Sequence, residues 1–313
     1  MTHRLTWADL PTSLHRRLEL LLGGPVTRLR SCSGGFSRSS AEIIEAASGR
    51  ALFVKAVRKQ DNPGAMQLNR SEAAALARIP SAAPVPALVD AFPNGDWFVL
   101  VTEVGRGAMP EEPWTTGDLS AVLAALDELQ ASATPCSVPD LPGVADTLGE
   151  DMLGFDRIAA DPPADLDPWI AAHLDALRAA ARRGIDALDG DTLCHSDLRA
   201  DNILLADDGR VSLVDWAWAS RGSRTADALQ LLSSIEDPDG ALEVDRHVDE
   251  LLVRHGRPLG EGTDVLAGIL AFFADAARHP HVPAMPLLGE HRRRRRDALL
   301  TLVRRRWERT AEA

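Results

Sequence analysis

The stretch from Thr192 to Ser220, TLCHSDLRADNILLADDGRVSLVDWAWAS, sets a polar loop between short apolar runs. Two of these runs, at residues 203–205 and 211–214, are joined through Asp-Asp-Gly, a turn sequence typical of β-hairpins. We therefore expect a short, rigid hairpin whose second strand ends directly in Asp215. This hairpin and the loop before it would hold a fixed set of polar side chains.

Three of those side chains stand out as oxygen donors at fixed spacing: Asp197, Asn202 five positions later, and Asp215 thirteen positions after Asn202. Carboxylate and amide oxygens suit hard divalent cations, and a carboxylate can also accept the proton of a hydroxyl group. Asp and Asn are common turn formers, but turn chemistry alone does not explain a whole set of polar residues placed against apolar strands. We interpret the three residues as a functional set.

The pattern H-x-D-L-x-x-x-N, followed by a strand that ends in Asp, is the catalytic-loop and metal-loop pattern of phosphoryl transfer in the protein-kinase fold. With HSDLRADN at 195–202 and VDW at 214–216, it resembles the aminoglycoside phosphotransferase and choline kinase family more than the protein kinases. A protein kinase would normally have Arg at Ser196 and Phe-Gly at 216–217. The resemblance implies an α+β, bilobal, protein-kinase-like fold: an N-terminal lobe with an antiparallel sheet and one main helix, and a larger, mostly helical C-terminal lobe.

Lysine is rare in this chain: among its 34 Lys and Arg residues, only Lys55 and Lys59 are lysines. A lysine inside the apolar run LFVKAV therefore indicates a specific role for a compact ammonium group. Phe53, Lys55 and Val57 share one face of the expected strand 51–57, so Lys55 should be partly buried and should need a carboxylate partner. An edge lysine that only extends to solvent is the alternative. In the kinase fold, a strand lysine contacts the α- and β-phosphates of ATP.

The carboxylate partner is expected on the segment that follows. Residues 67–79 have helix-forming composition, with apolar side chains at the spacing of one buried face. Glu72 lies one turn before Leu76, at the margin of that face, and it is the one acidic residue of the segment. We expect an ion pair between Glu72 and Lys55; a solvated glutamate favoured by the helix dipole is the alternative.

Two further segments are expected to contact the nucleotide. The run SGGFSRSS lies between two expected strands, and glycines there let backbone N–H groups approach phosphate oxygens, although Gly-Gly also occurs as a plain turn. By resemblance to the family, the phosphates would be covered by Ser33, Gly34, Gly35 and Ser37. Adenine would meet the backbone of the connector after the last strand of the sheet, at Glu103 and Val104.

We place the domain boundary in this connector, with a nucleotide-binding lobe at 1–104 and a catalytic and acceptor-binding lobe at 105–313. Apolar spacing predicts long helices at 118–131 and 168–188. The segment 132–168 is dense in Pro, Gly and Asp, which predicts a surface loop with short helical turns.

Composition bounds the class of protein. With 313 residues, 45% of them hydrophobic, the chain can bury a large core and is not disordered. The N-terminal residues lack a secretion signal, and no apolar run reaches membrane-spanning length. Three cysteines, odd in number and widely spaced, are typical of reduced thiols. We expect a cytoplasmic monomer or homodimer with no membrane partner.

Charge is distributed unevenly along the chain. Residues 1–104 carry a net charge of +3, residues 105–287 carry −20, and residues 288–313 carry +5. An acidic second lobe would attract cationic small molecules and repel nucleic acid; a surface that only keeps the protein soluble explains the sign equally well. The arginines at 292–296 and 304–306 alternate with apolar residues, which favours a solvated helix face that pairs with acidic groups over a nucleic-acid patch.

Taken with the resemblance, the motif implies γ-phosphoryl transfer from ATP or GTP to a hydroxyl of a small molecule. Asn202 and Asp215 would hold Mg²⁺, and Asp197 would accept or orient the hydroxyl proton. His195 would support the loop, and Asp227 matches a family Asp that braces the loop backbone. A cationic aminoglycoside-like antibiotic is one candidate acceptor, with antibiotic resistance as the corresponding role. A metabolic kinase for choline, amino alcohols or sugars, and a catalytically silent nucleotide-binding protein, are the alternatives.

Overall fold

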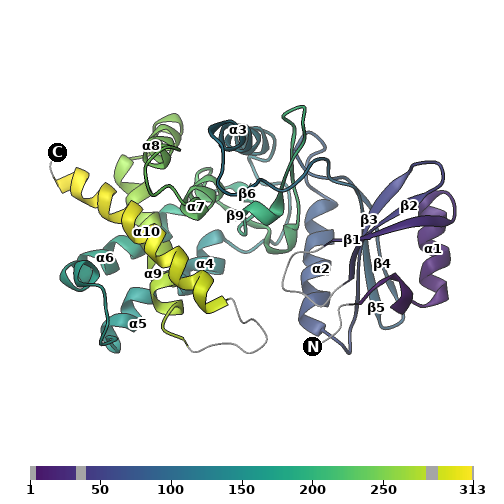
Figure 1. Cartoon of the computed structure of the whole chain (residues 1–313), viewed down its shortest axis with the longest axis horizontal. Coiled ribbons are helices and arrows are strands. Elements are labelled where there is room, and N and C mark those ends of the chain that lie inside the picture. Colours follow the sequence, from purple (N-terminus) through teal and green to yellow (C-terminus); the bar gives the residue numbers. More distant parts are fainter. Residues whose placement is uncertain (1–4, 33–39, 280–287, 312–313) are drawn as a thin grey trace. The chain divides into compact units, whose positions relative to one another are not determined.

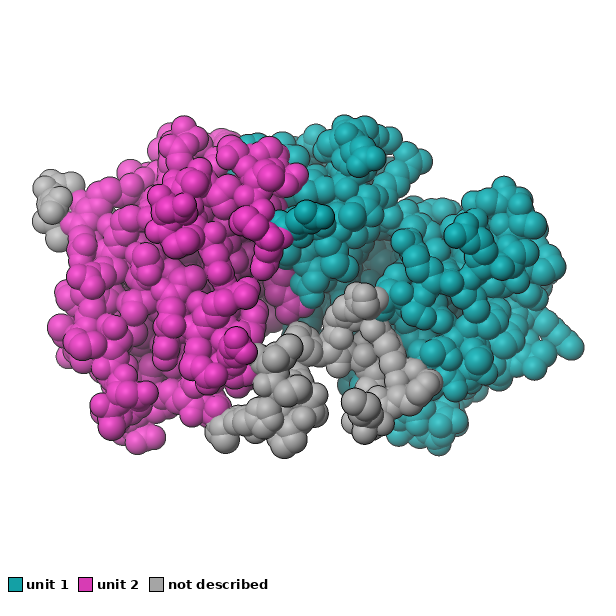
Figure 2. All heavy atoms as spheres, viewed as in Figure 1, with its two compact units in different colours: residues 1–111, 120–133, 200–219 teal, residues 112–119, 134–199, 220–313 magenta. Residues whose placement is uncertain are grey.

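The computed structural model describes residues 5–32, 40–279 and 288–311. Its chain divides into two compact units, coloured separately in Figure 2. The first unit contains Met1–Glu111, Ser120–Ala133 and Ala200–Ala219. The remaining segments, 112–119, 134–199 and 220–313, form the second unit. The division therefore assigns the hairpin that carries Asn202 and Asp215 to the same unit as the N-terminal segment, and Asp197 to the other.

An antiparallel five-stranded sheet forms the centre of the first unit. Its strands lie in the order β1-β2-β3-β5-β4, with all pairs antiparallel. Long-range pairing places the central strand β3 between β2 and β5, which keeps both of its edges hydrogen-bonded. The strands are β1 (Val26–Ser31), β2 (Ser40–Ala46), β3 (Ala51–Arg58), β4 (Leu88–Asn94) and β5 (Trp97–Glu103).

The two faces of this sheet are covered by different helices (Figure 1). Helix α1 (Thr12–Leu22) buries Leu14, Leu18 and Leu22 in a core shared with Leu52 and Val54 of the sheet. Side chains alternate between the two faces along a strand, so the β3 residues next to Leu52 and Val54 face away from this core.

Helix α2 (Pro63–Leu76) lies on the opposite face and packs against β3, β4 and β5. Asn62 caps it by accepting a hydrogen bond from the amide of Ala65 at 2.9 Å, and Pro63 occupies the first helical position, where its missing N–H is not needed. The helix therefore begins four residues before the predicted start at Gln67, because Asn62-Pro63 initiates the helix instead of separating it from the strand.

The predicted hairpin is present in the first unit as β7 (Ile203–Leu205) and β8 (Val211–Leu213). Backbone hydrogen bonds in both directions link Ala108, in the connector, to Leu205, at 3.0 and 2.8 Å. A further bond runs from the Leu213 amide to the carbonyl of Pro84 at 2.7 Å. These bonds fix the hairpin to the segments that flank the sheet, within the same unit.

The second unit is mostly helical and is built around α9 (Leu259–Ala276). Most residues of α9 are buried, and each of its neighbouring helices packs against it. A Cβ at Gly154 of α5 would overlap the carbonyl of Ala271, and a Cβ at Gly184 of α6 would overlap that of Asp264. Only glycine at these two positions lets the helices approach the backbone of α9 so closely. The neighbours are α4 (Val144–Met152), α5 (Gly154–Ala160), α6 (Pro168–Ala187), α7 (Ala226–Ser234), α8 (Val244–Arg254) and α10 (Leu288–Ala311).

The prediction of a surface loop with short helical turns at 132–168 is wrong in placing the whole segment at the surface. This segment forms α4 and α5, and Met152, Phe155 and Ile158 are buried. Gly154, one of the glycines that suggested a loop, instead lets α5 lie close against the backbone of α9. Helix α3 (Thr116–Ser132) forms as predicted to within two residues at its start.

The arginine-rich C-terminal segment forms α10, but it is not simply a solvated face. Arg306 is 1% exposed and donates to Asp249 Oδ1 at 2.8 Å and to the Thr263 hydroxyl at 3.2 Å. Arg295 is also buried, donates to the carbonyl of Ser233 at 2.7 Å, and has its pKa lowered to about 10 by that burial. The prediction that these arginines pair with acidic groups is confirmed for Arg306, whereas the prediction of solvent exposure is wrong for both. Across the described ranges, no helix combines the length and apolar composition needed to cross a membrane.

Candidate active site

Three charged side chains meet in the first unit. The Lys55 ammonium lies 2.7 Å from Glu72 Oε2 and 2.9 Å from Asp215 Oδ1. Lys55 comes from the sheet face that α2 covers, Glu72 from the buried side of α2, and Asp215 from the end of the hairpin. The predicted ion pair between Lys55 and Glu72 is therefore present, and Asp215 joins it.

Burial and charge act in opposite directions on this cluster. The side chain of Lys55 is 12% exposed and that of Glu72 is 5% exposed, whereas Asp215 is 40% exposed. Burial opposes the charge of Lys55, but the carboxylates of Glu72 and Asp215 outweigh it and raise its pKa above the ordinary value of 10.5. Lys55 is thus a permanent cation, and Asp215 is the member of the cluster most open to solvent.

Asp215 adopts a backbone conformation that few residues tolerate. Its φ is +67°, in the left-handed region, directly after β8. Asp is among the residues that enter this region most readily, but such a position costs about 1–3 kcal/mol and persists only where the surroundings enforce it. Trp216, fully buried, follows immediately and donates from its indole nitrogen to the carbonyl of Leu213 at 3.0 Å. The buried indole locks the turn that aims the Asp215 carboxylate.

Asn202 is held beside this turn by the backbone. Its carbonyl accepts a hydrogen bond from the Val214 amide at 2.9 Å, and its side chain is buried. Residue 214 directly precedes Asp215, so the two predicted metal ligands are joined through one backbone hydrogen bond and the β7–β8 ladder.

The predicted catalytic loop, residues 195–202, lies in the second unit up to Arg199. The Asp197 side chain is 30% exposed, and the Arg199 guanidinium lies 3.5 Å from its Oδ2. His195 is fully buried, and its Nδ1 accepts a hydrogen bond from the Asp197 amide at 3.3 Å. A buried imidazole that holds loop backbone agrees with the supporting role expected for His195.

Helix α7 holds the backbone of this loop with two side chains. Asp227 accepts hydrogen bonds from the amides of His195 and Ser196, at 2.7 and 3.0 Å. Burial raises the pKa of Asp227, and the two amide donors together with the neighbouring His195 offset part of that effect. The predicted bracing role of Asp227 is therefore confirmed by its contacts. The second side chain, Gln230, contacts the same loop one turn further along the helix.

The other predicted nucleotide contacts are placed as follows. Glu103 ends β5, and its carbonyl accepts a hydrogen bond from the Thr102 hydroxyl at 2.9 Å. Val104 follows in the connector and is half-buried. The glycine-rich loop, with the residues predicted to cover the phosphates, lies outside the described residues: Ser33, Gly34, Gly35 and Ser37.

The chemistry of the donor set fits a magnesium ion. Asp215 and Asn202 offer hard oxygen ligands, and Mg²⁺ is usually held by one or two protein oxygens together with substrate phosphates and water. Nowhere in the described ranges do three or more His, Cys, Asp or Glu side chains cluster as a complete protein metal cage. Two protein oxygens suit an ion whose remaining ligands come from a polyphosphate and water.

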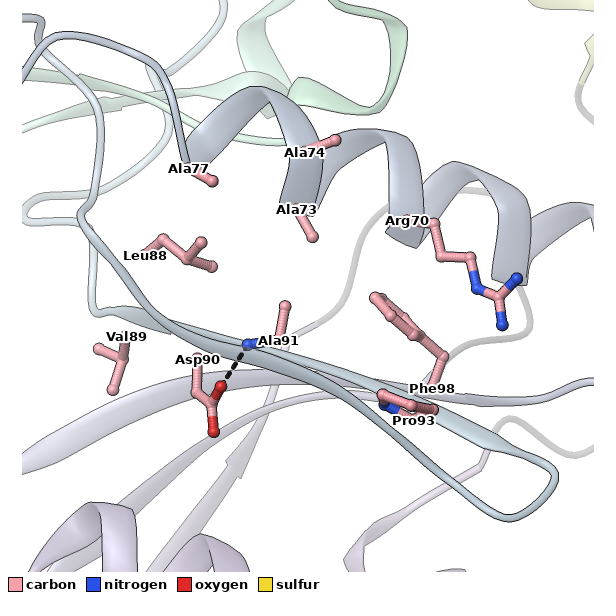
Figure 3. Close-up of a pocket in the computed structure, with 10 residues that line it drawn as sticks. All are labelled: Arg70, Ala73, Ala74, Ala77, Leu88, Val89, Asp90, Ala91, Pro93 and Phe98. Carbon is pink, nitrogen blue, oxygen red and sulfur yellow. Dashed lines mark hydrogen bonds between the residues drawn. The ribbon is translucent and has the colours of Figure 1, made fainter.

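A separate groove of about 640 Å³ lies between α2 and strands β4 and β5 (Figure 3). Small side chains at Ala73 and Ala77 leave the space, and Arg70 lies over the ring of Phe98 at its end, 5.5 Å from the centroid. None of the residues that line this groove belongs to the predicted site.

Solved structures with the same architecture are phosphotransferases. An aminoglycoside phosphotransferase from Alicyclobacillus acidocaldarius matches with a TM-score of 0.58 at 18% identity, over 91% of this chain and 93% of that one. A thermostable mutant of aminoglycoside phosphotransferase APH(4)-Ia, in complex with ADP and hygromycin B, matches with a TM-score of 0.53 at 18% identity, over 93% and 98%. The macrolide 2'-phosphotransferase MphH from Brachybacterium faecium matches with a TM-score of 0.57 at 16% identity, over 92% and 98%. These matches confirm the predicted α+β, kinase-like fold.

The sequence itself matches the model of a phosphotransferase enzyme family over residues 28–269. The chain belongs to this family, and the predicted enzyme class, a phosphotransferase, is confirmed. No curated protein matches the chain.

Two residues with contacts at the catalytic loop were not singled out from the sequence. Arg199 lies two positions after Asp197, a spacing that places it in the same loop but does not reveal its ion pair with Asp197. Gln230 lies three positions after Asp227, so helical periodicity places both on one side of α7. That periodicity was the available signal for Gln230, but a lone Gln among apolar residues does not identify its partners.

Proposed function

We propose that this phosphotransferase moves the γ-phosphoryl group of ATP or GTP to a hydroxyl group of a small molecule, with cationic aminoglycoside-like antibiotics as the first acceptor class to test. The contact of Lys55 with Glu72 and Asp215 carries this proposal. The buried, permanently charged ammonium of Lys55 lies next to the partly exposed carboxylate of Asp215, and this pair supports a site for a triphosphate and its divalent ion.

Lys55 anchors the α- and β-phosphates, and Glu72 keeps it oriented. Asp215 and Asn202 hold Mg²⁺, which when bound neutralises charge on the phosphates. Residues 1–104 form the nucleotide-binding lobe. The connector binds adenine through the backbone of Glu103 and Val104. The glycine-rich loop covers the phosphates with Ser33, Gly34, Gly35 and Ser37.

Asp197 accepts or orients the proton of the acceptor hydroxyl, within a catalytic and acceptor-binding lobe at 105–313. Its carboxylate is partly exposed, so it can be reached, and its loop is held by buried groups. Holding a proton acceptor in a fixed place supplies rate through orientation and general-base catalysis.

The acceptor class rests on charge and on relatives. Residues 105–287 carry a net charge of −20, which favours cationic acceptors. The structure of APH(4)-Ia noted above is a complex with ADP and hygromycin B, an antibiotic ligand. We propose antibiotic modification in the cytoplasm as the cellular role.

A transfer screen tests this function. The full chain is incubated with ATP or GTP, Mg²⁺ and a panel of aminoglycosides, macrolides, amino alcohols and sugars, and products are read by mass spectrometry. We expect at least one cationic antibiotic to gain a single phosphoryl group, and a chelator to abolish the transfer. Phosphorylation confined to amino alcohols or sugars would replace the antibiotic assignment by a metabolic one. Nucleotide binding without transfer to any member of the panel would overturn the acceptor class proposed.

A further inference from the structure

The side chain of Gln230 spans the backbone on both sides of Asp197. Its Oε1 accepts a hydrogen bond from the Leu198 amide at 2.9 Å, and its Nε2 donates to the carbonyl of Ser196 at 3.0 Å. The residue between these two contacts is Asp197. The carboxamide thus bridges the peptide groups immediately before and after the residue to which the catalytic proton transfer is assigned.

Only a side chain that both donates and accepts can make this bridge. Asn and Gln carry one acceptor oxygen and one donor nitrogen on the same planar group, whereas a carboxylate only accepts and a lysine only donates. Gln230 matches the carbonyl of Ser196 and the N–H of Leu198 at the same time. A second side chain on the same helix, Asp227, takes the amides of His195 and Ser196.

The loop backbone needs such support at Ser196. Its φ is +62°, a left-handed conformation that a serine adopts only when its surroundings enforce it. The Ser196 amide is held by Asp227 and its carbonyl by Gln230, while its hydroxyl bonds that of Ser220. Gln230 therefore holds the peptide that sets the direction in which the next residue, Asp197, leaves the backbone.

Helix α7 does not depend on this side chain for its own position. Leu229, Leu231 and Leu232 are buried, and the buried Arg295 donates to the last turn of the helix at the carbonyl of Ser233. Gln230 itself is only half-buried. Removing its carboxamide should leave the helix in place and release the loop.

We propose that Gln230 is a positioning residue for phosphoryl transfer: by bridging the peptides on either side of Asp197, it holds that carboxylate in the orientation needed to accept the acceptor's proton. The proposal rests on the proposed function of Asp197. It assigns Gln230 an effect on the chemical step and none on nucleotide binding, because the Lys55 cluster does not involve α7.

The test compares Gln230→Leu, which puts a slightly smaller apolar side chain in place of the carboxamide and loses both hydrogen bonds, with Gln67→Leu, the same chemical change at an exposed position of α2. Turnover is measured with the acceptor from the panel that the wild type phosphorylates fastest. We expect Gln230→Leu to lower kcat by about tenfold or more, with the KM for ATP within about twofold of the wild type. Gln67→Leu should change neither.

Hydrogen exchange of the Leu198 amide supplies a readout that needs no acceptor. Loss of its partner in Gln230→Leu should speed exchange of this amide by about tenfold, with the melting temperature nearly unchanged. Unchanged exchange would show that Gln230 does not hold the loop and would overturn the proposal.

Gln230→Glu adds a pH test that a purely structural role would not move. A charged Glu can accept from Leu198 but faces the carbonyl of Ser196 with a second acceptor, whereas a protonated Glu can donate to that carbonyl. Because contact with the carbonyl of Ser196 favours the protonated carboxyl, its pKa should lie above the ordinary value of about 4.3, and the kcat of Gln230→Glu relative to the wild type should rise as the pH falls from about 8 to about 5. A ratio that stays flat across this range would contradict the bridge.

The outcomes separate this proposal from the function on which it rests. A wild type that transfers phosphate, beside a Gln230→Leu variant with unchanged kcat, would overturn the role of Gln230 alone. A wild type that transfers phosphate to no hydroxyl would overturn the proposed function and the catalytic role of Gln230 with it.

Discussion

Two regions of the molecule fix their functional side chains in different ways. In the first unit, Glu72 and Asp215 each contact the Lys55 ammonium directly, so the lysine holds both carboxylates through their side chains. In the second unit, Asp197 is placed through its backbone, which Asp227 and Gln230 hold from α7. The first arrangement fixes charged side chains through their contacts with Lys55, whereas the second fixes the backbone on either side of Asp197.

The difference follows from what each region is proposed to bind. A triphosphate with its ion is a large, multiply charged ligand, and opposite charges held in contact keep Lys55 ionised and aimed until it arrives. A general base must instead remain accessible while its direction is fixed, so it is best held through its backbone and not through its carboxylate. Changes in the two regions should therefore affect different steps of the reaction.

The largest effect is expected for Asp197→Ala. Loss of the proton acceptor should lower kcat by at least about a hundredfold, with the affinity for ATP nearly unchanged. Steady-state kinetics with the panel acceptor and nucleotide titration measure the two quantities. Asp207→Ala, in the exposed turn of the β7–β8 hairpin, is the matched control and should leave both unchanged. Wild-type turnover in Asp197→Ala would refute the proposed role.

A smaller effect, on the other step, is expected for Lys55→Arg. The planar guanidinium cannot replace a compact ammonium held between two carboxylates, so kcat/KM for ATP should fall by at least about tenfold. The second lysine of the chain supplies the control: Lys59→Arg, at an exposed position, should behave as the wild type. If both variants kept full kcat/KM, the Lys55 cluster would not be the phosphate anchor.

Loss of the ion pairs of Asp275, in α9 of the second unit, should affect stability and leave catalysis unchanged. Asp275 is buried and accepts from Arg157 Nε at 2.5 Å and from Arg278 Nη2 at 2.7 Å. Asp275→Asn should lower the free energy of unfolding by about 1–3 kcal/mol at neutral pH, with kcat unchanged. Urea unfolding of both proteins measures this difference.

The same pair predicts a pH dependence. Burial opposes the charge of Asp275, but hydrogen bonds from Arg157 and Arg278 outweigh it and lower its pKa below 3.8. A depressed folded-state pKa means that the stabilisation is present above 3.8 and is lost as the pH falls through the folded value. The gap between wild type and Asp275→Asn should thus shrink below about pH 3.8. A gap that widens in acid would contradict this assignment.

The smallest signal is expected from the thiol next to the catalytic loop. Cys194 is 1% exposed, and burial raises its pKa well above the ordinary value of 9.0. It should stay unreactive toward a thiol reagent at about pH 8 while the half-exposed Cys32 and Cys136 react. All three should react after denaturation. Rapid reaction of Cys194 in the native protein would show that the strand before the loop opens easily.

Sequence patterns were most informative where residue type and local spacing determine the structure. The lone lysine in an apolar strand and the one glutamate of the next helix predicted the ion pair that the structure contains. The turn Asp-Asp-Gly predicted the hairpin β7–β8. In each case a local pattern was sufficient, because residue type and spacing alone set the outcome.

Patterns failed where long-range packing decides. Pro and Gly between residues 132 and 168 predicted a loop, but Gly154 lets a helix lie against the backbone of α9, a contact that no local spacing contains. Buried Arg295 and Arg306 were mistaken for solvated residues for the same reason. Gln230 was missed because its partners are backbone groups, and every residue carries the same backbone groups whatever its type.

Titration of a non-hydrolysable ATP analogue with Mg²⁺ into the wild type, Asp215→Ala and Asp197→Ala tests the division between the two regions most directly. We expect Asp215→Ala to lose at least about tenfold in affinity, because the ligand for the ion is gone, and Asp197→Ala to bind as the wild type does. Equal affinities for all three proteins, or a loss confined to Asp197→Ala, would contradict this account.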